Sequence, residues 1–125
     1  MTGWRARIGF LVPPGNPTVE PEMIELAPVG VSVHFTRMSA SGSAGTHSGQ
    51  EERTRNQIAN LDEATRLMAM VSPQAIVLAH TATSYTLGRE AEEMLVRRLE
   101  ASSGARFVTA FGGVVEAKAF DTFMA

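Results

Sequence analysis

The stretch Ile8-Gly-Phe-Leu-Val-Pro-Pro-Gly-Asn16-Pro-Thr-Val-Glu20-Pro-Glu22 reads as a short apolar strand that runs directly into a loop of proline, glycine and polar residues. The stretch Ala75-Ile-Val-Leu-Ala-His80-Thr-Ala-Thr-Ser-Tyr-Thr-Leu-Gly88 repeats this arrangement. A helical pattern follows each loop. Ligands of open α/β sheets bind at loops that follow the carboxyl ends of strands. The two stretches therefore predict an α/β fold in which both loops contribute to one ligand site.

The rest of the sequence alternates between strand and helix patterns. Strands are predicted at 7–12, 29–38, 75–79 and 106–110, and helices at 18–26, 50–72, 88–102 and 112–123. A long loop is predicted at 39–49, and Met68, Met70 and Met94 are predicted to pack in the core. This order predicts one flavodoxin-like α/β domain over residues 1–125. Its four-stranded sheet is expected to be mostly parallel, with helices on both faces.

Composition narrows the functional classes. The chain has 125 residues, a net charge of −2 and no basic excess, so no nucleic-acid partner is predicted. Its apolar runs are too short to cross a membrane and no signal-peptide pattern is present, so the expected location is the cytoplasm. The absence of cysteine excludes disulfides and a thiolate nucleophile within this chain. No metal-ligand spacing or dinucleotide fingerprint occurs, so no metal and no cofactor are predicted.

The first loop carries one polar amide side chain, that of Asn16, on a rigid backbone. Pro13, Pro14 and Pro17 restrict the chain, Gly15 permits a close approach, and Asn16 supplies an amide with donors and an acceptor. Such a loop can hold a carboxylate at the end of a strand. The simpler interpretation is that Asn16 only caps the helix that follows.

The second loop combines hydroxyl groups with a predicted helix N-terminus. Thr81, Thr83 and Ser84 lie within four residues, and the backbone amides there lack helical partners. This pattern is typical of sites for a carboxylate, a phosphate or an enolate oxygen. Capping alone is the alternative. His80 directly follows the strand, either as a general base or as a hydrogen-bonded structural residue.

These residues resemble a known family. The segment from Gly9 to Glu22 resembles the opening of maleate cis-trans isomerases, and Ile76 to Gly88 resembles a second signature shared with arylmalonate decarboxylases. Both groups belong to the aspartate/glutamate racemase superfamily. The tail from Thr109 to Phe120 resembles the third strand-to-helix junction of that family. The resemblance spans nearly the whole chain.

The family fold consists of two similar α/β halves with a carboxylate-binding cleft between them. The resemblance implies that the present domain corresponds to the N-terminal half. It implies that Pro14 and Asn16 border the substrate, and that Thr81 with the backbone amides of Ala82 and Thr83 holds a carboxylate or enediolate. His80 stands where the family's first-half cysteine is expected.

Two departures from the family shape the functional hypotheses. The chain lacks both catalytic cysteines, and it has about half the family's usual length. A cofactor-independent isomerase, racemase or decarboxylase of a small carboxylate is the first hypothesis, with Asn16, His80 and Thr81 as catalytic residues. A non-catalytic carboxylate-binding or truncated remnant domain is the second, and a structural half that needs a partner chain is the third. A homodimer is expected, because a second copy would supply the missing half of the cleft.

Overall fold

The computed structural model describes residues 3–39 and 47–110. Within these ranges strands and helices alternate along the chain. In chain order they are β1 (Ala6–Val12), α1 (Val19–Leu26), β2 (Val31–Arg37), α2 (His47–Ala59), α3 (Leu61–Ala69), β3 (Ala75–Leu78), α4 (Thr81–Leu87), α5 (Arg89–Ser103) and β4 (Arg106–Thr109). The helix predicted at 112–123 lies outside the described residues.

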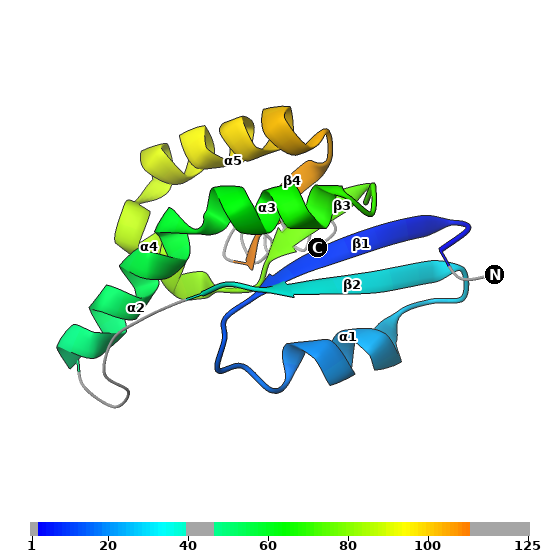
Figure 1. The fold of residues 1–125 in the computed structure, drawn as a ribbon, viewed down its shortest axis with the longest axis horizontal. Helices are drawn as coiled ribbons and strands as arrows, with labels where there is room; N and C mark the ends of the chain where they lie inside the picture. Colours follow the sequence, from blue (N-terminus) through cyan, green and yellow to red (C-terminus); the bar gives the residue numbers. More distant parts are fainter. Residues whose placement is uncertain (1–2, 40–46, 111–125) are drawn as a thin grey trace, which may run out of the picture.

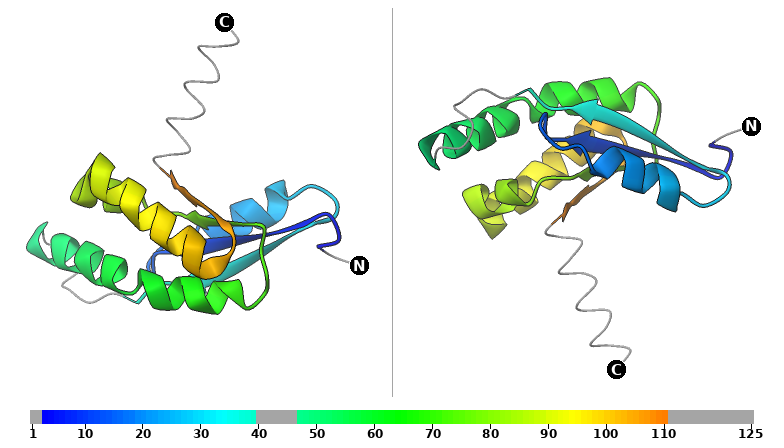
Figure 2. Two further views of the ribbon diagram at one scale, coloured as in Figure 1. Left: turned by 90° about the horizontal axis from the view of Figure 1, so that it is seen from above. Right: turned by 90° about the horizontal axis from the view of Figure 1, so that it is seen from below.

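The four strands form one sheet in the order β2-β1-β3-β4, and every neighbouring pair is parallel. The α/β class, the four strands and the flavodoxin-like arrangement are thus confirmed. Figure 1 shows α3 and α5 above this sheet and α1 below it, and the views in Figure 2 agree. The helices therefore cover both faces, as right-handed crossovers in a sheet of this order require.

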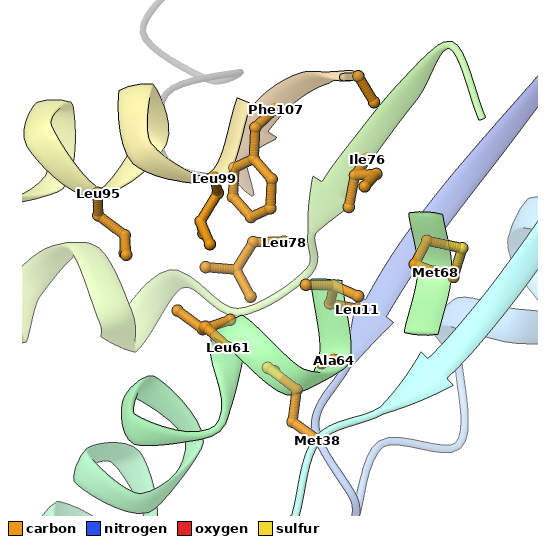
Figure 3. Close-up of a cluster of buried hydrophobic side chains, with 11 residues drawn as sticks. Leu11, Met38, Leu61, Ala64, Met68, Ile76, Leu78, Leu95, Leu99 and Phe107 are labelled. Atoms are coloured by element: carbon orange, nitrogen blue, oxygen red, sulfur yellow. The ribbon is translucent and has the colours of Figure 1, made fainter. Parts of the chain in front are cut away.

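The main core lies between the sheet and the pair α3 and α5 (Figure 3). Alternate residues of the strands point into it, because successive side chains of a strand face opposite sides of the sheet. Leu11 of β1 and Leu78 of β3 are fully buried there, together with Leu61 of α3 and Leu99 of α5. Each such leucine contributes roughly 1.5–3 kcal/mol by leaving water.

Gly9 allows α3 to approach β1 closely. A Cβ at this position would lie 2.4 Å from the Sδ atom of Met68, which is itself buried against the sheet. The prediction that Met68 belongs to the core is confirmed. The same prediction for Met70 and Met94 is wrong, since these side chains are 75% and 65% exposed. Met94 neighbours Leu95, and the buried stripe of α5 runs through Leu95 rather than through Met94.

The single helix predicted at 50–72 is two helices, α2 and α3, separated at Asn60. The Asn60 side-chain amide donates to the Asn56 carbonyl at 2.7 Å, and Asn60 has φ −97° and ψ 3°. Side-chain bonds of this kind compete with the helical ladder. Helix α2 begins at His47, inside the loop predicted at 39–49, and residues 40–46 of that prediction lie outside the described residues.

None of the described helices is long and apolar enough to cross a membrane.

Candidate functional site

The strands β2, β1 and β3 end level with one another. Val12 pairs with Arg37, Leu11 pairs with Leu78, and the Ala79 amide donates to the Leu11 carbonyl at 3.0 Å. The residues that follow β1 and β3 therefore lie side by side at one edge of the sheet. This is also where the strand order reverses, because the chain goes from β1 to β2 on one side and to β3 on the other. Such switch points are the usual ligand sites of open α/β sheets.

Asn16 lies in the loop between β1 and α1. Its Oδ1 atom accepts hydrogen bonds from the Thr18 and Val19 amides at 2.9 and 3.0 Å, and from the Thr18 hydroxyl at 3.1 Å. Thr18 is the N-cap residue of α1 and its own side chain makes no capping bond, so the Asn16 carbonyl oxygen binds the amides at the helix start in its place. Among the described residues its Nδ2 group has no hydrogen-bond partner. One half of the amide stabilises the helix start, and the other half is available to a ligand.

Arg37 fixes the loop that carries Asn16. From the end of β2, its Nη1 group donates to the carbonyls of Pro13 at 3.1 Å and Asn16 at 2.9 Å, with a longer contact to Pro14 at 3.4 Å. Its Nη2 group donates to the Glu20 carboxylate in the first turn of α1. One guanidinium thus joins β2, the loop and α1. Pro14 itself is exposed at the surface.

Sequence reasoning missed Arg37. The one signal available was its place at the end of an alternating strand next to a predicted ligand loop. The contacts themselves span 17 to 24 residues of sequence, so no local pattern contains them.

The segment after β3 differs from its prediction. Residues 81–85 were expected to form a loop, but helix α4 begins at Thr81. The backbone amides of Ala82 and Thr83 therefore belong to the first turn of a seven-residue helix, where amides have no helical acceptors. Ala82 is half-buried and Thr83 is buried. The side chains of Thr81 and Ser84 lie outside what the structure describes.

His80 immediately precedes α4 and contacts its first turn. The Nδ1 atom of its half-buried ring lies 3.0 Å from the Thr83 hydroxyl oxygen, and Thr83 is 1% exposed. Burial lowers the pKa of His80 below its ordinary value. The ring is therefore neutral at neutral pH, with one nitrogen that donates and one that accepts.

A shallow hollow beside the junction of α4 and α5 is lined by residues 87–91 and Met94, none of which is a predicted site residue. No group of three or more His, Asp or Glu side chains within 3–39 and 47–110 is arranged to hold a metal.

No protein-family model matches the chain, and no curated protein matches it by sequence. Solved structures do match. A variant of the maleate isomerase Iso from Pseudomonas putida S16, crystallised with maleate, has a TM-score of 0.72 and 17% identity over 89% of this chain. The Nocardia farcinica maleate cis-trans isomerase bound to TRIS has a TM-score of 0.70 and 25% identity over the same share.

The chain has the fold of one half of a maleate isomerase. It spans 47% of the Pseudomonas enzyme and 46% of the Nocardia enzyme, which agrees with the resemblance to the family's N-terminal half. The fold is thus shared with these isomerases.

Proposed function

We propose that this chain binds a small carboxylate at the junction of β1 and β3 and catalyses its isomerisation, racemisation or decarboxylation without a cofactor. The observation that carries the proposal is that the β1–α1 loop and the start of α4 both follow strand ends at the switch point of a sheet with the maleate isomerase fold. Asn16 would donate through its unpartnered Nδ2 group. The Thr81 hydroxyl and the amides of Ala82 and Thr83 would hold the carboxylate, with Ser84 and Pro14 at the border of the site.

The chemistry has to proceed without thiols, because the sequence contains no cysteine. In a decarboxylation, a malonate-type substrate loses CO2 and leaves an electron pair delocalised over an enediolate. Donors at the site would stabilise that anion before a proton completes the product. His80 is the proposed proton carrier, and solvent restores its proton.

The second candidate is a domain that binds a carboxylate without turning it over. The absence of both family cysteines favours this alternative, since a thiol-based two-base mechanism is impossible within this chain. Calorimetric titration with maleate, aspartate, malonate and phenylmalonate, followed by product analysis, separates the two. Binding with turnover supports the enzyme, and binding alone supports the second candidate.

We expect Thr81→Val to weaken carboxylate binding, because the change removes a hydroxyl donor at nearly constant volume. The loss should be about 1 kcal/mol or more, roughly fivefold or greater in affinity. Thr86→Val is the matched control, because Thr86 lies on the same helix and is exposed. Calorimetry with maleate measures both. Equal affinity of Thr81→Val and wild type would show that Thr81 has no role in binding.

We also propose that two copies associate. The likeness covers about half of the isomerase fold, and a second copy would supply a second half of the cleft. Helix α1 and the turn after it expose Ile24, Leu26 and Val29, with exposed fractions of 61%, 71% and 84%. Exposed apolar surface of this kind favours association. Sedimentation equilibrium should give the mass of a dimer, whereas a monomer at high concentration would contradict the proposal.

A further inference from the structure

The tautomer of His80 follows from the surroundings of Thr83. The Thr83 side chain is 1% exposed, and the His80 Nδ1 atom at 3.0 Å is the one hydrogen-bond partner of its hydroxyl among the described residues. A buried hydroxyl proton needs an acceptor, and here Nδ1 is the acceptor at hand. If Nδ1 carried a proton, the Thr83 oxygen would accept it, and the Thr83 hydroxyl proton would have no acceptor among the described residues. Nδ1 must therefore be the unprotonated nitrogen.

A neutral imidazole has one protonated nitrogen, so an accepting Nδ1 leaves the proton on Nε2. Within the described ranges Nε2 has no partner of its own. It is the nitrogen left for a ligand at the end of β3. Thr83 is thus a positioning residue, because it acts on the site through the ring of His80.

We infer that the Thr83 hydroxyl holds His80 as the Nε2–H tautomer, which presents a hydrogen-bond donor, not a base, to a carboxylate or enediolate oxygen. Neutral imidazole N–H groups act as electrophiles in this way in enzymes of other folds. The consequence of this tautomer for catalysis rests on the proposed function. In this state His80 is suited to stabilise an oxyanion through its Nε2–H group. Delivery of that proton requires the ring to take a second proton from solvent, so that a neutral imidazole remains. His80 is unsuited to remove a proton from an α-carbon, because Nε2 is already protonated.

The test reads the ring directly and needs no substrate. Protein labelled with ¹⁵N in its histidines gives two-bond ¹H–¹⁵N correlations that identify the protonated nitrogen of each ring, and His34→Gln and His47→Gln assign the signals. At neutral pH we expect His80 with a protonated Nε2, and an Nδ1 resonance displaced toward that of a hydrogen-bonded acceptor. Thr83→Val should move Nδ1 to its free-acceptor position and admit some Nδ1–H form, and Thr83→Ser should restore the wild-type spectrum.

His34 is the internal control. Its Nε2 atom lies 2.9 Å from the Ser32 hydroxyl on β2, so its signals should stay unchanged in the Thr83 variants. A protonated Nδ1 in the wild-type protein would overturn the inference. So would an Nδ1 resonance that is the same in wild type and Thr83→Val. Should Thr83→Val fail to fold, the wild-type spectrum still tests the inference, because a protonated Nδ1 there would overturn it. If no carboxylate is bound or turned over, the proposed function fails while the tautomer result stands.

Discussion

Leu78→Ala is expected to lower the free energy of unfolding by about 2–5 kcal/mol. Leu78 is fully buried on β3, at the centre of the cluster between the sheet and helices α3 and α5 (Figure 3). The shorter side chain loses apolar burial and leaves a cavity that the rigid sheet cannot fill by collapsing. Since a domain of this kind has a total stability of roughly 5–15 kcal/mol, the loss is a large share of it.

The matched control is Leu67→Ala, the same chemical change on the outer side of α3, where the side chain is 44% exposed. We expect that variant to lose less than about 1 kcal/mol. Urea denaturation followed by circular dichroism gives both values. Equal losses in the two variants would show that the cluster around Leu78 is not the main core.

The fold was predictable because its signals are local. The apolar runs of β1 and β3 are bounded by proline, glycine and polar residues, and this pattern indicates buried parallel strands. The break at Asn60 was not predictable, because helical periodicity continues through it. It depends on a side-chain bond from Asn60 to the Asn56 carbonyl. Helix α4 is built from threonine, serine and tyrosine, which have modest helix propensity, so its sequence indicated a loop.

The candidate site was predictable only in part. Asn16 and His80 could be selected as candidates because each lies in the segment just after a strand, and parallel strands place such segments at one edge of the sheet. The support around them is not local. Arg37 reaches the Asn16 loop from another strand, and the link between His80 and Thr83 requires the helix that the sequence did not indicate. The residue pattern of a single strand or helix gives no sign of contacts with distant residues, so these contacts could not be predicted.

Asn16→Asp is expected to separate the two roles of Asn16. The new carboxylate retains an acceptor for the Thr18 and Val19 amides, which Oδ1 now binds at 2.9 and 3.0 Å. A negative charge at a helix N-terminus is favourable by about 0.3–1 kcal/mol. The hydrogen bond from Arg37 to the backbone carbonyl of residue 16 does not involve the side chain that is changed. The free energy of unfolding should therefore stay equal to the wild-type value or rise slightly.

Carboxylate binding should fall sharply in the same variant. The exchange replaces the free Nδ2 donor with an anionic oxygen, which repels a bound carboxylate instead of donating to it. The lost donor and the repulsion together should reduce maleate affinity at least tenfold, or about 1.4 kcal/mol. Asn16→Ala is the companion variant, because it should lose both the cap, at about 0.5–2 kcal/mol of stability, and the donor. Calorimetry gives the maleate affinity of both variants, and urea denaturation gives their free energies of unfolding. Wild-type affinity in Asn16→Asp would mean that Asn16 only caps α1, and that the carboxylate, if bound, is held by the first turn of α4 alone.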